Sequence, residues 1–431
     1  MTYRRCLGLI LALCLIFSVS AAGVDSAQGA KDSLYGKTLL VLGDSYTAAY
    51  GLQRYEDCWP WILAEHCGMT QLNYSISGSS FAAGPNGYSP MVERCRELPT
   101  DKPVDIILVQ GGSNDFARNV PLGDLSSRDE TTFCGALTLI LDYLEETYPE
   151  AQIVCFTPWI SNAGANSDGL LSADYTAAMV ALCENRGILC YDASQADQNG
   201  MYLSDEAFRS RFCLTATDRY HLNPAGHRRF APIIAQWLCE NLYGSAPSDR
   251  YTDLSGASES LRDAVDTLAP AGILTGTGDR LFSPTRAADR ADLAQCLYRL
   301  AGEPSVTDYT FSDLSAQDLD YQALCYMVDT GLYGESSEIQ PKQVLTRQML
   351  ATVLYRYYTD LLAHFVDNLT GLGSYPDGDQ VAAYAKLPMG WALAAGVLQD
   401  KDGWLRPGSA VSRGELAETL TAFLRYIGEF S

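Results

Sequence analysis

A serine and a histidine in this sequence have neighbours that suit nucleophilic chemistry. Ser45 follows Gly43 and Asp44 directly after an apolar run, and Asp218 precedes His221 by three residues in a polar segment. A serine hydroxyl becomes a nucleophile when a base removes its proton. An aspartate that accepts the Nδ1 proton of a histidine leaves Nε2 free to be that base. The pattern therefore predicts Ser45 as nucleophile, His221 as base and Asp218 as its orienting partner.

Both halves of this arrangement also have a structural interpretation. Ser45 can cap the helix that follows it, and Asp218 can close an Asx turn. The chain has three other histidines, which are expected to be structural or exposed: His66, His227 and His364. His227 in particular is expected on the surface of the last helix of this region.

The apolar runs indicate which elements must bring these residues together. Segments 38–42, 105–109 and 152–156 are uninterrupted, as expected of strands buried on both faces. Amphipathic stretches lie between them, and strand–helix alternation predicts a parallel sheet covered by helices on both sides. Helices are predicted over 58–67, 130–147, 173–186 and 224–242, and a further strand over 187–191.

Two more polar segments follow predicted strands. Gly78 ends the stretch that begins at Tyr74, and Asn114 lies just beyond the strand 106–109. The carboxyl ends of parallel strands share one edge of the sheet, where ligands bind. There the N–H of Gly78 and the Asn114 amide could donate to an oxygen that becomes negative during acyl transfer. Each segment taken singly is typical of a turn, but all of them together predict one site.

In this order, the four segments resemble the sequence blocks of the SGNH (GDSL-type) hydrolases. The matching residues are Gly43-Asp44-Ser45, Gly78, Gly112-Ser113-Asn114-Asp115 and Asp218-Arg219-Tyr220-His221. The resemblance covers about 36–243 and implies a flavodoxin-like three-layer α/β/α fold and ester hydrolysis without metal or cofactor. It assigns the triad as above, with an oxyanion hole formed by the N–H groups of Ser45 and Gly78 and the side chain of Asn114.

Beyond Gly244 the sequence becomes turn-rich and then repeats three times. Each unit opens with an aspartate, and each has an arginine six residues after a proline, with leucines three and seven residues further on. Such offsets predict repeated helix–loop–helix modules of about sixty residues. The aspartates are Asp253, Asp313 and Asp377, and the arginines are Arg290, Arg347 and Arg413.

The units, over 251–302, 309–362 and 373–428, are similar to S-layer homology (SLH) modules. The Thr-Arg-Ala-Glu signature of that family appears as Asp289-Arg-Ala-Asp292, Thr346-Arg-Gln-Met349 and Ser412-Arg-Gly-Glu415. The resemblance implies an all-α pseudo-threefold domain that binds an anionic secondary polysaccharide of the cell wall. Arg290, Arg347 and Arg413 are then the candidate wall-polymer ligands, because guanidinium groups pair with carboxylates. The alternative is that these arginines only cap or bridge helices.

Charge and the N-terminus limit where the protein acts. The formal charge of −22 and the lack of a basic stripe argue against nucleic acid as a partner. Two arginines, the apolar run 7–17 and small residues predict a signal peptide over 1–22, too short to favour a membrane span. A linker over 23–35, the hydrolase domain over 36–245 and the repeats over 246–431 follow. No integral membrane segment is expected after signal cleavage.

Thirteen cysteines are present, and two of them lie in the predicted signal peptide. Most of the remainder occupy apolar positions and are expected to be free buried thiols. None has the spacing of a zinc site. If any pair were bonded, Cys183 with Cys190 would be the least implausible disulfide.

Together these features predict a secreted esterase that is attached non-covalently to the cell wall. It would act through an acyl-enzyme on Ser45, and its location favours O-acetyl groups on carbohydrate or wall polymer as substrate. Two alternatives remain open: a catalytically inactive carbohydrate-binding or adhesive surface protein, and a lipase- or lysophospholipase-type GDSL esterase. The intact set of catalytic residues weighs against the first, and the lack of a long apolar lid segment weighs against the second.

Overall fold

The computed structural model describes residues 33–158, 164–198, 203, 205–215, 217–218, 220–278 and 280–430. The predicted signal peptide and all but the last three residues of the predicted linker lie outside these residues. All of the described residues belong to one compact unit, Lys31–Ser431. No helix in the described part of the chain combines the length and the apolar character that a membrane crossing requires.

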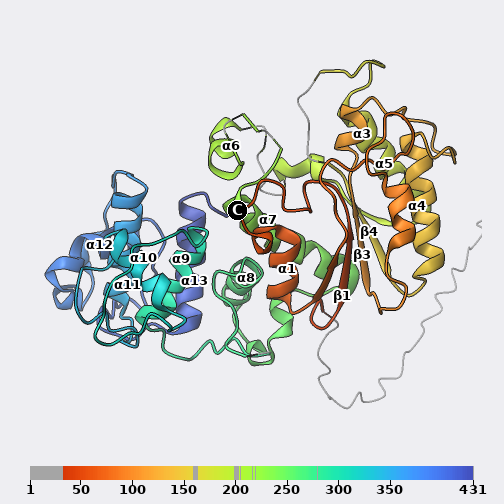
Figure 1. The fold of residues 1–431 in the computed structure, drawn as a ribbon. Helices are drawn as coiled ribbons and strands as arrows, with labels where there is room; N and C mark the ends of the chain where they lie inside the picture. The colour runs from red at the N-terminus through yellow and green to blue at the C-terminus, as the bar shows by residue number, and fades with distance from the viewer. Residues whose placement is uncertain are drawn as a thin grey trace, which may run out of the picture. The chain divides into compact units, whose positions relative to one another are not determined.

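A parallel sheet with strand order β2-β1-β3-β4-β5 organises the N-terminal part (Figure 1). The chain adds β2 on one side of β1 and then adds β3, β4 and β5 on the other, so the strand order reverses at β1. β1 and β3 are buried along almost their whole length, as expected of strands with helices on both faces. The strands are β1 (Thr38–Leu42), β2 (Thr70–Asn73), β3 (Ile106–Gln110), β4 (Gln152–Phe156) and β5 (Leu189–Tyr191).

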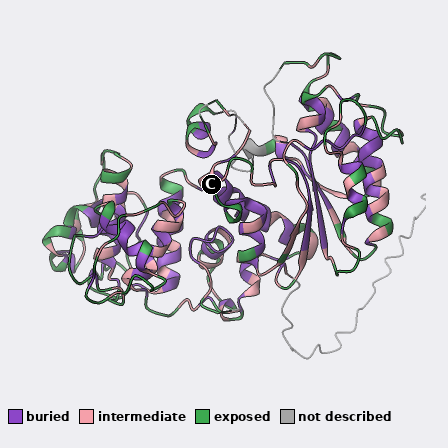
Figure 2. Cartoon of the chain, viewed as in Figure 1, coloured by how far each residue is buried: buried purple, intermediate pink, exposed green. Residues whose placement is uncertain are grey.

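Each face of the sheet has its own apolar core (Figure 2). Leu39 and Val41 pack with residues of α1 (Trp59–Cys67) and α7 (Pro224–Leu238). Leu40 and Leu42 pack with residues of α4 (Phe133–Thr147) and α5 (Ser172–Arg186). The predicted three-layer α/β/α fold is therefore confirmed. The shorter helices are η1 (Tyr55–Asp57), α2 (Met91–Arg94), η2 (Cys95–Glu97), α3 (Ser113–Ala117), η3 (Ala193–Gln198), α6 (Glu206–Phe212) and η4 (Cys239–Tyr243).

The helices predicted from the sequence differ from the observed ones mainly at their ends. The predicted helix 130–147 begins at Phe133, because the hydroxyl of Thr132 accepts the N–H of Gly135 and caps α4. Asp129 is engaged in a turn, where its carboxylate accepts the N–H of Thr131. The sequence signal at these positions was thus a cap and a turn rather than a first helical turn.

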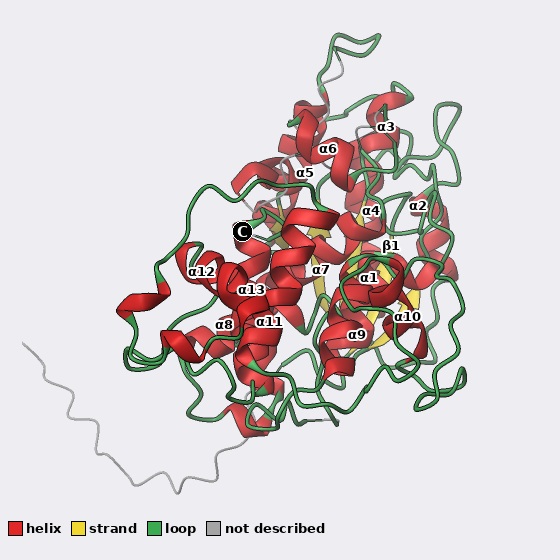
Figure 3. Cartoon of the chain, turned by 90° about the vertical axis from the view of Figure 1, so that its left-hand side faces the viewer, coloured by secondary structure: helices red, strands yellow, loops and turns green. Residues whose placement is uncertain are grey.

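All five named strands precede residue 192, and the named elements beyond α7 are helical (Figure 3). α9 packs against α10, α11 against α12 and α13 against α8. Isolated β-bridges before α9, α11 and α13 (Asp289 with Val344, Thr346 with Ala410 and Ala287 with Ser412) connect the three units in a ring. The six main helices are α8 (Glu259–Leu268), α9 (Arg290–Leu300), α10 (Tyr321–Asp329), α11 (Arg347–Arg356), α12 (Lys386–Ala394) and α13 (Arg413–Tyr426). The short turns between and before them are η5 (Pro247–Arg250), η6 (Thr252–Leu254), η7 (Tyr357–Leu361), η8 (Leu372–Ser374), η9 (Gly378–Gln380) and η10 (Ala383–Ala385).

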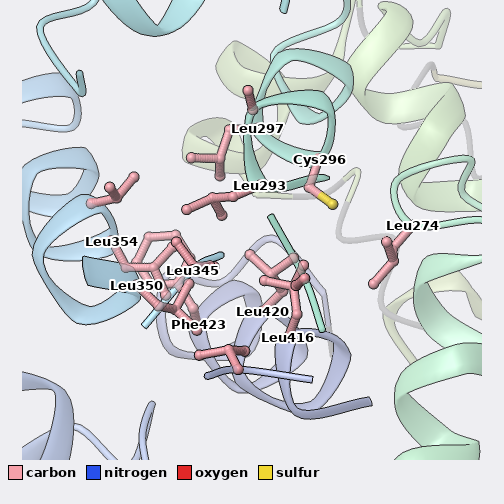
Figure 4. Packing of buried hydrophobic residues seen from close by; sticks show 14 of the residues in the cluster. Leu274, Leu293, Cys296, Leu297, Leu345, Leu350, Leu354, Leu416, Leu420 and Phe423 are labelled. Atoms are coloured by element: carbon pink, nitrogen blue, oxygen red, sulfur yellow. The ribbon is translucent and has the colours of Figure 1, made fainter. Parts of the chain in front are cut away.

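The residues that recur in the sequence hold equivalent places in this ring. Asp253, Asp313 and Asp377 each accept two consecutive backbone N–H groups from the loop of their own unit. The recurring leucines point toward one another in a shared core (Figure 4). These leucines are Leu293, Leu297, Leu350, Leu354, Leu416 and Leu420. The predicted all-α, pseudo-threefold architecture is thus confirmed.

Cysteines and histidines give one confirmation and one correction. All eleven described cysteines are free thiols, which confirms the expectation, and Cys183 and Cys190 are among them. The prediction that His227 lies on the surface is wrong: it is 4% exposed. The face of α7 that carries His227 meets the start of α1, where the N–H of Trp59 donates to Nδ1 at 3.2 Å.

The buried His227 should make the protein sensitive to acid. Burial lowers the pKa of His227 from 6.5 to about 3, so the unfolded chain takes up a proton at this residue where the folded chain does not. Stability is then lost as pH falls below 6.5, by about 1.4 kcal/mol per pH unit for this residue. His227→Gln keeps a hydrogen-bond acceptor without a titrating group. Urea unfolding between pH 7 and pH 4 should show a shallower loss in the variant, and parallel curves would contradict the assignment.

Candidate active site

The turn after β1, the loop after β2 and the start of α3 after β3 lie at one edge of the sheet. Ser45, Gly78 and Asn114 lie in these three segments. His221 approaches the same edge from the loop between α6 and α7. The backbone of this loop is fixed by a hydrogen bond from the N–H of Leu214 to the carbonyl oxygen of His221, 2.9 Å long.

A continuous hydrogen-bonded chain links the three predicted catalytic side chains. Ser45 Oγ lies 2.8 Å from His221 Nε2, and His221 Nδ1 lies 2.9 Å from Asp218 Oδ2. The other carboxylate oxygen accepts the N–H groups of Tyr220 and His221. This is the arrangement in which a base can deprotonate a serine while a carboxylate fixes its tautomer.

The electrostatics of Asp218 suit its position behind the base. Burial by itself raises the pKa of Asp218, but the hydrogen bonds from the backbone N–H groups of His221 and Tyr220, together with the imidazole, hold this pKa below its ordinary value. The carboxylate therefore stays ionised at neutral pH. An ionised carboxylate stabilises the imidazolium that forms when His221 takes up a proton.

Two of the three predicted oxyanion donors, Gly78 and Asn114, belong to the segments after β2 and β3. Gly78 has φ of +82°, a left-handed conformation that favours glycine. The Asn114 amide donates to the carbonyl oxygen of Ser79, the residue after Gly78, at 3.0 Å. It also donates to Asp44 Oδ2 at 3.3 Å. Asn114 thus ties the Gly78 loop to the turn that carries Ser45.

Two buried carboxyl groups, to which the sequence analysis gave no role of their own, hold this edge of the sheet together. Asp44 is fully buried and accepts the N–H of Tyr46 at 3.0 Å, and burial raises its pKa to about 7. Asp115 accepts the N–H groups of Phe81 and Ala82, and burial raises its pKa to about 6. A buried charge is costly unless it is hydrogen-bonded, so both residues are committed to fixing loops. The sequence signal was their place between a buried strand and a turn.

Sequence reasoning missed Arg94, which belongs to no motif. Its guanidinium, on α2, donates to the Tyr74 carbonyl at 2.6 Å, to Ser79 Oγ at 2.8 Å and to the Ser89 carbonyl at 3.1 Å. One side chain thereby joins the end of β2 to the loop beyond Gly78. Only the tertiary structure brings these acceptors within its reach.

A cavity of about 220 Å³ opens beside the nucleophile. Ser45, Asn114 and His221 are among its polar lining residues, and Phe116, Ala117 and Pro158 are among its apolar ones. Gly78 is not among the lining residues. Within the described residues, no cluster of three or more His, Cys, Asp or Glu side chains is arranged to hold a metal ion. The site thus brings a serine hydroxyl, an imidazole and an amide donor to the wall of one cavity.

Two of the three repeat arginines are buried and form hydrogen bonds and ion pairs within the helical domain. Arg347 is 1% exposed; it donates to the carbonyl oxygens of Leu405 and Gln399 and forms an ion pair with Glu415. Arg413 is 3% exposed and makes the corresponding contacts one unit further on. Its partners are the carbonyl oxygens of Phe282 and Thr275 and the carboxylate of Asp292. The geometry at these two arginines favours the bridging interpretation.

Arg290 differs because the residue that would be its acidic partner, at position 349 of the second unit, is a methionine. Its Nε donates to the Ile339 carbonyl of the second unit at 3.0 Å, as the Nε groups of Arg347 and Arg413 donate to the carbonyls of Leu405 and Phe282. Met349 stands where Asp292 and Glu415 stand, and no ion pair of Arg290 occurs among the described residues. Instead the guanidinium lies 3.8 Å from the centroid of the Tyr333 ring.

Comparison with known families agrees with this geometry. Residues 41–229 match the GDSL-like lipase/acylhydrolase family, and residues 250–294 and 374–417 match the S-layer homology domain. The chain contains a GDSL-like hydrolase domain followed by SLH repeats. The middle repeat, 309–362, is not matched and stays a prediction.

Individual relatives are distant. The surface-layer 125 kDa protein of Lysinibacillus sphaericus is 24% identical over 193 residues, which are 43% of this chain and 16% of that protein. The chain therefore spans less than a fifth of the length of this curated relative. A putative GDSL-like lipase from Bacteroides ovatus is 19% identical over 48% of this chain and 99% of its own, with a TM-score of 0.36. A family two carbohydrate esterase from Clostridium thermocellum, solved with cellohexaose, is 16% identical over 49% of this chain and 66% of its own, with a TM-score of 0.33.

The arginines of the SLH repeats should differ in what they contribute to stability. Arg347→Met removes a buried cation and leaves Glu415 and two carbonyl groups with fewer partners, so unfolding should become easier by about 3 kcal/mol. Arg290→Met removes one hydrogen bond and a ring contact at a half-buried site and should cost about 1 kcal/mol. Urea unfolding of the two variants measures the difference. Equal losses would contradict the distinction.

Proposed function

We propose that this protein is a serine esterase that acts at the cell surface, with Ser45, His221 and Asp218 as its triad. The observation that supports this most directly is the 2.8 Å contact between Ser45 Oγ and His221 Nε2, with Asp218 bonded to the other ring nitrogen. These residues lie 176 positions apart in the sequence. A cap or an Asx turn would not require them to meet.

The chemistry proceeds in two steps. Ser45 Oγ attacks the ester carbonyl while His221 takes its proton, and the negative oxygen is met by the N–H groups of Ser45 and Gly78 and the Asn114 amide. For this, Asn114 exchanges its long contact with Asp44 for the substrate oxygen. His221 then gives the proton to the leaving alcohol, which leaves an acyl-enzyme on Ser45. Water, deprotonated by His221, releases the acid and restores the serine.

The cavity beside Ser45 supports a short acyl group, with acetyl as the first candidate. Its apolar wall is formed in part by Phe116, Ala117 and Pro158, and its volume of about 220 Å³ limits the acyl chain. A long-chain lipid ester is therefore less well accommodated. Attachment through SLH repeats would hold the enzyme beside acetylated polysaccharides, which favours O-acetyl groups on carbohydrate or wall polymer. An inactive surface protein, the other alternative, would have no need of the intact hydrogen-bonded triad.

Ser45→Ala should abolish hydrolysis of short p-nitrophenyl esters, with kcat falling on the order of 10⁴-fold or more. The variant lacks the oxygen that forms the acyl-enzyme, and its fold and wall binding should be unchanged. A fluorophosphonate probe should label the wild type and not the variant. Normal turnover by Ser45→Ala would show that the nucleophile lies elsewhere.

We further propose that the SLH repeats bind an anionic wall polysaccharide and that Arg290 makes the main contact. Arg347 and Arg413 already have carboxylate partners within the protein. Met349 supplies none to Arg290, whose guanidinium is half-buried and lies against the Tyr333 ring. A cation that is oriented in advance and lacks an internal counter-charge suits a ligand carboxylate, such as that of a ketal-linked pyruvate. Arg347 and Arg413 then contribute by shaping the ring.

Arg290→Gln should weaken binding to purified cell-wall sacculi about tenfold, which corresponds to the loss of one charge-assisted hydrogen-bonded contact. Arg406→Gln is the matched control, since it removes an equal charge from an exposed site in the third repeat. Co-sedimentation measures binding, and ester hydrolysis should be unchanged in both variants. If Arg290→Gln binds as tightly as Arg406→Gln, Arg290 is not the main contact.

A further inference from the structure

Tyr50 is an exposed aromatic residue beside the base of the triad. Its ring centroid lies 4.5 Å from that of His221, and the side chain is still 49% exposed. Tyr46 contacts the same imidazole at 5.4 Å but is buried. Contact with Tyr46 and the bonds to Ser45 and Asp218 already orient His221, so positioning the base does not explain why Tyr50 offers a ring to solvent.

The position of Tyr50 relative to the base is fixed by close packing of two loops. The next residue, Gly51, has φ of +74°, and a Cβ at this position would lie 2.4 Å from a methyl carbon of Leu214. The N–H of Leu214 in turn donates to the carbonyl oxygen of His221. A side chain at 51 would be strained by this φ and would have to displace the Leu214 side chain. The Tyr50 loop therefore packs closely against the loop that carries His221.

The chemistry places the alcohol half of the ester on this side of Ser45. His221 Nε2 must give its proton to the leaving oxygen, so the atoms bonded to that oxygen lie beside the imidazole. The cavity that suits the acyl group is not lined by Tyr50. Tyr50 instead contacts the imidazole from another side, next to Tyr46. The exposed part of its ring is therefore within reach of the group bonded to the leaving oxygen.

We propose that Tyr50 is a specificity-determining platform on which the alcohol half of the substrate, a sugar ring, lies. The inference rests on the proposed esterase function and names the recognition element for its leaving group. A pyranose or furanose ring has an apolar C–H face that packs on an aromatic ring, whereas a small aliphatic alcohol lacks this surface. Tyr88 has similar exposure on the opposite side, near Gly78, but the Arg118 guanidinium covers its ring at 5.0 Å. Tyr88 is therefore a matched control.

The test varies the alcohol and keeps the acyl group constant. Wild type, Tyr50→Ala, Tyr50→Phe and Tyr88→Ala are compared on ethyl acetate and on O-acetylated xylo-oligosaccharides, with Ser45→Ala as the blank. Tyr50→Ala should lower kcat/KM for the oligosaccharide about tenfold more than for ethyl acetate, chiefly through KM. Tyr50→Phe should keep the wild-type ratio between the two esters, because it retains the ring. Tyr88→Ala should also leave this ratio unchanged.

The outcomes separate this inference from the function on which it rests. If Tyr50→Ala lowers activity on both esters equally, the ring only supports His221, and the platform is overturned while the esterase assignment stands. The same conclusion follows if Tyr88→Ala shifts the ratio as strongly as Tyr50→Ala. If the wild type hydrolyses neither ester above the Ser45→Ala blank, the proposed function fails, and the role of Tyr50 fails with it.

Discussion

The hydrogen bond between Ser45 and His221 constrains nearly everything else in the hydrolase domain. It joins the first strand of the sheet to a loop that the chain reaches 176 residues later. Keeping two such distant segments within 2.8 Å requires a rigid support between them. The parallel sheet provides it, because β1 is paired on both sides and covered by helices on both faces.

The edge of the sheet that carries the site is held together by charged side chains whose burial is unfavourable by itself. Asp44, Asp115 and Arg94 are buried to differing extents. Burial raises the pKa of the two carboxyl groups and lowers the pKa of the guanidinium, which in each case favours the neutral form. Backbone N–H groups and carbonyl oxygens of neighbouring loops offset the penalty of burial. Each of these residues bonds to a loop other than its own, which makes the loops after β1, β2 and β3 a single rigid unit. A preorganised oxyanion site depends on such rigidity.

The SLH ring shows a similar use of polar groups with a different outcome. In two of its units an arginine and an acidic residue neutralise each other across the boundary between units. At the boundary between the first and second units Met349 occupies the acidic position, and the cation of Arg290 has no such partner among the described residues. The same fold position thus holds a complete ion pair in two places and an arginine without an acidic partner in the third. One residue difference in the sequence, Met349 in place of an acidic residue, separates the two arrangements.

Residue types and spacing alone determined the strand runs, the triad candidates and the three-part repetition, because these depend on local pattern. Apolar periodicity fixes which segments are buried, and the order of the blocks fixes which polar residues follow strands. Tertiary structure alone decided that His227 is buried, that Asp44 and Asp115 fix loops, and that Arg94 takes part. It also distinguished Arg290 from Arg347 and Arg413 and placed Tyr50 against the base. The physical reason is that burial, hydrogen-bond partners and ring contacts depend on segments far apart in the chain, whose distances no local pattern encodes.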